Sequence, residues 1–224
     1  MPTLPYEKSA AIYVPVNGVT LTGIVITPEP AIGMVAFAHG VSSSRFSPAD
    51  RYIAKKLNEA GFATLLIDLL TPGERASSQQ RDIKANINLL SSRLVCIIDW
   101  IKKEVSLRSL PLGFYGSNVS STATLVAAKE RPEGIETLVL SNARPDLIKE
   151  YLSAVKIPVL LIAGDKDRAQ LQLNRELVES IQSSHRIEII TGSTHDLENP
   201  IVLEQIASQA HKWFSKHMNK PAVL

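Results

Sequence analysis

This sequence of 224 residues has little cysteine, a small net charge and no long apolar run. The single cysteine, Cys96, excludes a framework of internal disulfides and is typical of a reducing compartment. Lys and Arg number 24 against 22 Asp and Glu, and a net charge of +2 gives no reason to expect nucleic acid or an anionic membrane as a partner. No apolar run approaches the roughly 20 residues of a membrane span.

Motifs for bound groups are missing as well. The sequence holds no G-x-G-x-x-G or G-x-x-x-x-G-K loop that would cradle a phosphate, and no His, Cys or carboxylate pair with the spacing of a zinc or calcium site. We therefore expect no cofactor and no metal. The first residues lack a basic segment followed by an apolar one, so we expect no secretory signal and a cytoplasmic protein.

The sequence does have the composition of a globular domain. Hydrophobic residues make up 45% of the chain and charged residues 21%, and no repeat, low-complexity tract or linker divides it. A chain of this length buries about 70% of its unfolded surface, so it needs no metal or disulfide to stabilise its core. We expect a single domain over residues 1–224.

Short apolar segments alternate with amphipathic ones along the chain. The pattern predicts strands at Ala11–Val16, Thr20–Thr27, Met34–Ala38, Ala63–Ile67, Pro111–Tyr115, Glu136–Leu140, Val159–Ala163 and Arg186–Ile190. It predicts helices from Pro48 to Gly61 and at Asp82–Lys103, Val119–Ala128, Asp146–Ser153, Ala169–Gln182 and Ile201–His217. The Asn17-Gly18 dipeptide favours a tight hairpin, because both residues tolerate positive φ. Together these features predict an α/β fold: a mostly parallel twisted sheet with helices on both faces and an N-terminal antiparallel hairpin.

Polar residues follow several of the predicted strands. In an open parallel sheet, binding sites form at the carboxyl ends of the strands. Those ends are followed by HGVSSSR from His39, GSNVS from Gly116, SNAR from Ser141, GDKD from Gly164 and TGSTHD from Thr191. These five segments are therefore the candidates for a site.

Four longer stretches at these strand ends share one resemblance. They are FAHGVSSSRFSPADRYIAKKLNEAGFATLLIDLLTP, LGFYGSNVSSTATLVAA, VLLIAGDKD and IITGSTHDLENP. In this order, over roughly residues 19–214, the sequence resembles the dienelactone hydrolase family of the α/β-hydrolase superfamily. The resemblance implies the α/β-hydrolase fold and the hydrolysis of esters, lactones or thioesters by a nucleophile, an Asp and a His in that chain order.

The resemblance also implies roles for particular residues. Carried over by position, the acid is Asp167 of GDKD and the histidine is His195 of GSTHD. The oxyanion donors would be backbone N–H groups, one at Val41 after the third strand and one at Val119 behind the nucleophile. The implied partner is a small ester-, lactone- or acid-like molecule.

The nucleophile position departs from the family pattern G-x-S-x-G. Gly116 matches the leading glycine, but Asn118 occupies the central position and Ser120 takes the place of the trailing glycine. A carboxamide has no hydroxyl to deprotonate and is a very poor nucleophile at neutral pH. Asn tolerates positive φ better than most residues, so we expect the sharp turn to form although the nucleophile is missing.

Three substitutes for the nucleophile stay open, namely Ser117, Ser120 and an Asn118 deamidated to aspartate. Ser117 precedes the apex of the turn and Ser120 follows it within the first helical turn, so their side chains should leave in other directions. A misplacement of even 1 Å can cost on the order of 100-fold in rate. The following Val119 would slow deamidation of Asn118.

Other residues near the strand ends have both structural and functional interpretations. His39 is expected to tie the turn after the third strand together, and Asp167 could instead cap the helix that follows it. Ser42 belongs either to the pocket mouth or to a solvated loop, and Arg144 either meets an anionic ligand or forms a surface salt bridge. The polar stretch Leu69–Gln80 is a candidate lid over the site.

Three hypotheses of different classes follow. The first is a catalytically impaired or repurposed α/β-hydrolase-fold protein, which Asn118 favours. The second is a working ester hydrolase that uses one of the three substitutes, which the presence of Asp167 and His195 favours. The third is a non-enzymatic binding or interaction protein, since fold does not fix function. The substrate and the oligomeric state are not indicated by the sequence.

Overall fold

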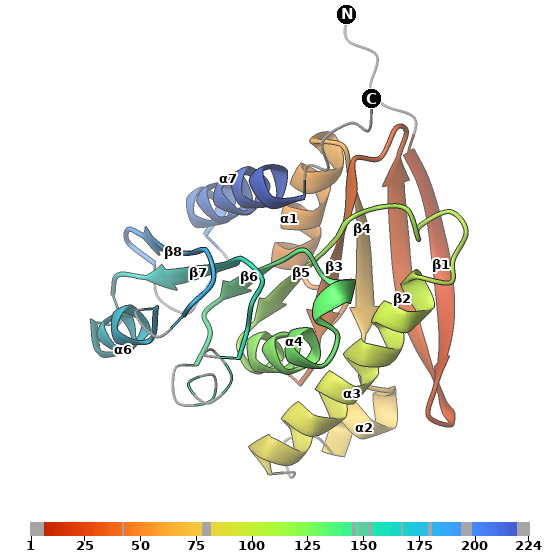
Figure 1. The fold of residues 1–224 in the computed structure, drawn as a ribbon, viewed down its shortest axis with the longest axis horizontal. Coiled ribbons are helices and arrows are strands. Elements are labelled where there is room, and N and C mark those ends of the chain that lie inside the picture. The colour runs from red at the N-terminus through yellow and green to blue at the C-terminus, as the bar shows by residue number, and fades with distance from the viewer. Residues whose placement is uncertain are drawn as a thin grey trace, which may run out of the picture.

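A twisted sheet of eight strands runs through the centre of the computed structural model (Figure 1). The structure describes residues 7–41, 43–77, 82–144, 147, 149, 151, 154–166, 168–178, 181–193 and 199–218. Within these residues the strands are β1 (Glu7–Val16), β2 (Val19–Pro28), β3 (Gly33–His39), β4 (Phe62–Asp68), β5 (Leu112–Ser117), β6 (Thr137–Ser141), β7 (Val159–Gly164) and β8 (His185–Ile190).

The order of the strands in the sheet is β1-β2-β4-β3-β5-β6-β7-β8. β1 and β2 form an antiparallel hairpin and β2 pairs antiparallel with β4, whereas all the other neighbours are parallel. Asn17 and Gly18 turn the hairpin with φ of 46° and 82°, values that these two residue types tolerate. The predicted fold class, a mostly parallel sheet with an antiparallel N-terminal hairpin, is confirmed.

Helices cover both faces of this sheet. In the described part of the chain they are α1 (Pro48–Glu59), α2 (Pro72–Ser77), α3 (Ile83–Ile101), α4 (Val119–Glu130), α6 (Arg168–Val178), α7 (Pro200–His217) and the short 3₁₀ helix η2 (Pro132–Gly134). Figure 1 shows α1 and α7 on one face and α3 and α4 on the other, and a cluster of buried apolar side chains fills each interface. None of the helices described here is long and apolar enough to cross a membrane.

The helix ends follow from capping residues in the sequence. The Ser47 hydroxyl accepts a hydrogen bond from the Asp50 N–H at 3.3 Å, which caps α1, and the Asp82 carboxylate accepts from two backbone N–H groups at the start of α3. Gly61, with a φ of 89°, turns the chain from α1 into β4.

Two segments differ from the prediction, and a third falls largely outside the described residues. β1 begins at Glu7 rather than at Ala11, because its ladder with β2 continues to the pair of Glu7 and Pro28. Residues 72–77, expected within a polar loop, form the helix α2 instead. The helix predicted at Asp146–Ser153 falls largely outside the described residues.

The carboxyl ends of β3, β5 and β6 are neighbours at one edge of the sheet. The register pairs Ala38 of β3 with Gly116 of β5, and Gly116 with Leu140 of β6. The segments that leave these three strands therefore begin side by side, which places the loop after β3 next to the turn between β5 and α4.

Candidate active site

A sharp turn joins β5 to α4, and Asn118 stands at its apex. The backbone of Asn118 has φ 51° and ψ −125°, outside the regions that most residues adopt. Its N–H donates to the Ser141 carbonyl at 3.1 Å, and its carbonyl accepts from the Ser121 N–H at 3.1 Å. The Asn118 carboxamide makes no capping bond with α4, so the side chain at the apex does not hold the turn.

Gly116 explains how β5 and α4 approach each other so closely. A Cβ atom on residue 116 would lie 3.0 Å from the Ser121 Cα, 3.0 Å from the Thr124 Oγ1 and 3.2 Å from the Ser120 carbonyl oxygen. Two of these three neighbours are backbone atoms, which cannot rotate away. The turn therefore needs glycine two residues before its apex, and it needs no hydroxyl at the apex itself.

The two serines beside the apex have different surroundings. Ser117 ends β5 and is partly exposed. Ser120 is only 3% exposed, and its Oγ would lie 2.7 Å from a Cβ atom placed on Gly40. The Ser120 hydroxyl is thus enclosed between α4 and the loop after β3, which counts against Ser120 as a substitute nucleophile.

The two predicted oxyanion donors come from matched positions on neighbouring strands. Ala38 pairs with Gly116, and Val41 and Val119 each lie three residues beyond their member of that pair. Both valines are partly buried and pack against the same core cluster. The fold therefore brings the loop and the helix start that carry these N–H groups to the same edge of the sheet.

His39 is buried beneath the loop after β3. Its Nδ1 lies 3.2 Å from the Ile67 carbonyl oxygen, and its Nε2 lies 3.2 Å from the Asp50 Oδ2, close enough for an ion pair although the groups are not aligned for a hydrogen bond. Nearby, burial and then the Asp50 charge raise the pKa of Tyr115 above its ordinary value, so this phenol stays neutral. His39 thus links β3 to β4 and α1, in agreement with the structural role expected for it.

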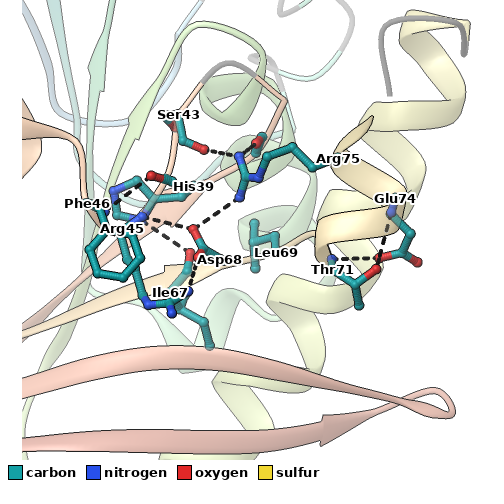
Figure 2. Close-up of polar contacts among 12 residues, drawn as sticks. His39, Ser43, Arg45, Phe46, Ile67, Asp68, Leu69, Thr71, Glu74 and Arg75 are labelled. Atoms are coloured by element: carbon teal, nitrogen blue, oxygen red, sulfur yellow. Dashed lines mark hydrogen bonds and ion pairs between the residues drawn. The ribbon is translucent and has the colours of Figure 1, made fainter. Parts of the chain in front are cut away.

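A cluster of charged side chains holds the other side of the same loop (Figure 2). Asp68, the last residue of β4, accepts from the Arg45 backbone N–H at 2.9 Å and pairs with the guanidinium groups of Arg45 and Arg75. Arg75 also donates to the carbonyl oxygens of Gly40 and Ser43. The loop is therefore fixed by charged groups from β4 and α2.

An ion pair between Glu74 of α2 and Arg93 of α3 anchors α2. The two carboxylate oxygens of Glu74 accept from Arg93 at 2.6 and 2.7 Å, and one of them also accepts from the Thr71 N–H at 2.8 Å. The Arg93 hydrogen bonds, and then those from Thr71, lower the pKa of Glu74 from 4.5 to about 2, although desolvation opposes them. Arg93 is 3% exposed and donates to the Leu69 carbonyl at 2.6 Å as well.

Sequence reasoning does not identify this charged cluster. One signal was present, because Arg93 stands beside Leu94 and close to Leu90 on the apolar face of α3, where a charged group needs a partner. That partner, Glu74, comes 19 residues earlier, and no local pattern indicates such a separation. Glu74 lies in the stretch predicted as a lid. In the structure Leu69 of this stretch is buried, and α2 contacts the loop after β3 through Arg75.

The segments that follow β7 and β8 lie next to each other. The Asp165 carboxylate accepts from the Gly192 N–H at 2.7 Å, and backbone hydrogen bonds join the same two segments. They lead to Asp167 and His195, the predicted acid and histidine, but these two residues and Ser42 lie outside the described residues. Their roles stay predictions.

The rest of this edge offers space for a ligand. A hollow of about 450 Å³ borders the loop after β3, with Val41, Phe46 and Arg75 on its walls. Arg144 follows β6 with an exposed side chain. In the part of the chain that the structure describes, no three His, Cys, Asp or Glu residues are grouped to hold a metal ion.

Among the solved structures that resemble this chain, one matches nearly its whole length at high identity. It is a dienelactone hydrolase from Anabaena variabilis ATCC 29413, and it superposes with a TM-score of 0.89. The two chains are 40% identical, and the match covers 97% of this chain and 100% of the other. No family model matches the sequence.

Two curated relatives come from Mycobacterium tuberculosis, strains CDC 1551 / Oshkosh and ATCC 25618 / H37Rv, and both are named as candidate phosphoribosyl transferases. Each is 38% identical to this chain over 217 residues, which cover 97% of this chain and 48% of the relative. This chain therefore spans about half the length of these curated relatives.

More distant structures share the fold. Est1E from Butyrivibrio proteoclasticus has a TM-score of 0.79 at 15% identity, over 94% of this chain and 99% of its own. An esterase from Pyrococcus furiosus has a TM-score of 0.74 at 16% identity, over 95% and 91% of the two chains. At such low identity the likeness concerns the arrangement of strands and helices alone.

Proposed function

Since this chain belongs to the dienelactone hydrolase family of the α/β-hydrolase superfamily, we propose that it binds a small ester-, lactone- or acid-like molecule at a hydrolase-type site that has lost its nucleophile. The observation that carries the proposal is the carboxamide of Asn118 at the apex between β5 and α4. A carboxamide cannot be deprotonated at neutral pH to attack a carbonyl carbon. The protein is then a catalytically impaired or repurposed hydrolase.

The expected size of the impairment is large. In a serine hydrolase of another fold, loss of the nucleophile lowers turnover about 10⁶-fold and leaves roughly 10³-fold over water from binding and the oxyanion hole. The backbone of the elbow and the charged cluster behind the loop after β3 are both formed here. We therefore expect a folded protein that binds ligand and hydrolyses esters only feebly.

Restoring a hydroxyl at the apex tests the proposal. The Asn118→Ser protein should hydrolyse 4-nitrophenyl acetate or butyrate at least about 100-fold faster than the parent, since a nucleophile that is present but imperfectly placed still recovers part of the lost factor. Asn118→Ala is the control, because it changes the same position without supplying a hydroxyl. If the parent already hydrolysed these esters at ordinary enzyme rates, the proposal would be wrong.

A working hydrolase is the second candidate, and the presence of Asp167 and His195 in the sequence favours it. It would use Ser117, Ser120 or an Asn118 converted to aspartate, and the burial of Ser120 argues against that serine. Intact-mass measurement separates the routes: a fluorophosphonate adduct on the parent reports a reactive serine, and a gain of about 1 Da with no probe reports deamidation.

A non-catalytic binding or interaction protein is the third candidate, because this fold does not by itself require catalysis. Tight ligand binding to both the parent and Asn118→Ser, with no turnover by either, would favour it. The transferase name of the Mycobacterium tuberculosis relatives belongs to proteins of which this chain spans only about half. A cytoplasmic location remains an expectation from the single cysteine.

A further inference from the structure

Arg75 bonds to the peptide unit that carries one predicted oxyanion donor. Its Nη1 lies 2.7 Å from the carbonyl oxygen of Gly40 and also donates to the carbonyl oxygen of Ser43 (Figure 2). In a planar trans peptide, the C=O of one residue and the N–H of the next point in opposite directions. The bond to the Gly40 oxygen therefore sets the direction in which the Val41 N–H points.

We propose that Arg75 is a positioning residue, which aims the Val41 N–H at the ligand oxygen and makes it a stronger donor. A cation bonded to the Gly40 oxygen draws electron density from that amide, and hydrogen bonds that share an amide strengthen each other. The inference rests on the proposed function, because the direction of the Val41 N–H matters only if the site binds an acyl oxygen.

Arg75 is itself held in place by a carboxylate. Its Nη2 lies 3.1 Å from the Asp68 Oδ1, and the side chain of Asp68 is only 10% exposed. Asp68 also accepts the Arg45 backbone N–H at 2.9 Å, so one carboxylate bonds both the loop and the side chain that holds it. This arrangement fixes the guanidinium relative to the Gly40 carbonyl.

The helix that carries Arg75 is anchored to α3 and to β3. Glu74 is bound by both terminal nitrogens of Arg93, and Arg93 donates to the Leu69 carbonyl at 2.6 Å. The N–H of Leu69 in turn donates to the His39 carbonyl at 2.9 Å. The two carbonyls that precede Val41, those of residues 39 and 40, are therefore both bonded to the segment after β4.

Packing limits movement of Gly40 on its other side. A Cβ there would meet the Ser120 Oγ at 2.7 Å and the Leu90 Cδ1 at 2.8 Å, so the peptide lies against α4 and α3. With α4 on one side and the Arg75 guanidinium on the other, the peptide has one orientation. Among the described residues, loss of Arg75 removes the hydrogen bond that the Gly40 carbonyl accepts, so the peptide can rotate.

A spectroscopic measurement tests the inference without any need for catalysis. The dipeptide Gly-Val occurs at Gly18-Val19 and Gly40-Val41 only. Labelling with ¹³C-carbonyl glycine and ¹⁵N valine therefore gives two signals in a carbonyl-to-amide correlation spectrum. In Arg75→Met the Gly40 carbonyl carbon should move upfield and the Val41 amide should shift with it, while the Gly18-Val19 signal in the hairpin stays as an internal reference.

Kinetics in the Asn118→Ser background supply the second measurement. Removing one oxyanion donor typically costs 10²–10³ in kcat, so we expect Arg75→Met to lower kcat by about 100-fold with KM little changed. Arg75→Lys, which keeps one charged donor, should recover part of the loss and part of the carbonyl shift. Arg131→Met is the control, because Arg131 pairs with Asp99 and, among the described residues, takes no part in the charged cluster that holds the loop after β3.

The two measurements separate the inference from the function it rests on. An inactive Asn118→Ser protein would contradict the proposed function, and the Val41 signal would still decide the role of Arg75. An unmoved Gly40 and Val41 signal in Arg75→Met would overturn the inference, as would equal kcat losses in Arg75→Met and Arg131→Met.

Discussion

The elbow and the loop after β3 border the same candidate site, but they are held in different ways. The elbow depends on backbone groups: Asn118 makes its two hydrogen bonds through its main chain, and Gly116 admits the backbone of α4. The loop depends on charged side chains, through Arg75, Asp68 and the Glu74–Arg93 pair behind them. The elbow is therefore held mainly by backbone contacts, one of them to the Ser141 carbonyl of β6, whereas the loop is held by charged side chains from β4, α2 and α3.

This difference shows that the elbow can keep its backbone shape when its reactive side chain is lost, whereas the loop after β3 cannot keep its shape without its charged side chains. The elbow tolerates a carboxamide at its apex, because no side chain at residue 118 is needed to hold the turn. The loop after β3 has no such freedom, since the charges that hold it also set the direction of its peptide groups. Three measurements test this contrast.

The largest effect is expected when the charged support loses Glu74. Glu74→Ala leaves the buried Arg93 without its carboxylate partner. Breaking a buried pair in this way costs roughly 3–5 kcal/mol. Because Glu74 is partly open to water, we expect the free energy of unfolding to fall by about 3 kcal/mol, the lower end of that range. Urea unfolding followed by circular dichroism measures this loss. Glu74→Gln keeps a hydrogen-bonding group and should lose less. A loss under about 1 kcal/mol would match a surface ion pair and remove the contrast.

A smaller effect is expected when the backbone contact of the elbow is disturbed. Gly116→Ala places a methyl group 3.0 Å from the Ser121 Cα, and overpacking of this kind costs about 1–3 kcal/mol. Gly73→Ala is the matched control, because a Cβ there meets nothing within 4 Å and alanine favours a helix such as α2. Thermal unfolding of both variants should show a loss for residue 116 and no loss for residue 73.

The smallest effect is expected from mild acid. The pKa of Glu74 is about 2 in the folded protein, against an ordinary value of 4.5. Between these two pH values the unfolded chain therefore binds more protons than the folded protein does. The stability that Glu74 contributes is complete above pH 4.5 and is lost progressively as the pH falls toward 2. Between pH 6 and pH 3.5 the unfolding free energy of the parent should therefore fall more than that of Glu74→Gln. Parallel curves for the two proteins would contradict the role given to this carboxylate.

Local chemistry made much of the fold predictable. Asn17-Gly18 indicates the hairpin, Asp82 marks the start of α3, and the spacing of Gly116 and Asn118 predicts the strand–turn–helix of the elbow. Each of these features draws on one residue's φ preference or on a hydrogen bond within three residues along the chain. This local part is readable from the sequence, although the elbow is also held by the bond from the Asn118 N–H to the Ser141 carbonyl of β6.

The support of the loop after β3 was not predictable in the same way. The stretch that contains Glu74 and Arg75 is polar, contains Pro72-Gly73 and indicates a loop, although it forms α2. Its role becomes visible only when α3 brings Arg93 to it and when β3 and β4 lie side by side. The Gly40 carbonyl that Arg75 binds lies 35 residues earlier in the chain.

The sequence alone thus determined the alternation of strands and helices and the carboxamide at the apex of the turn, because periodicity, capping and φ preference act between near neighbours. Only the tertiary structure decided that Arg75 would reach the peptide before Val41 and that Ser120 would be enclosed. A hydrogen bond between distant segments forms only where packing brings donor and acceptor within about 3 Å, and the sheet register and the helix positions set that distance.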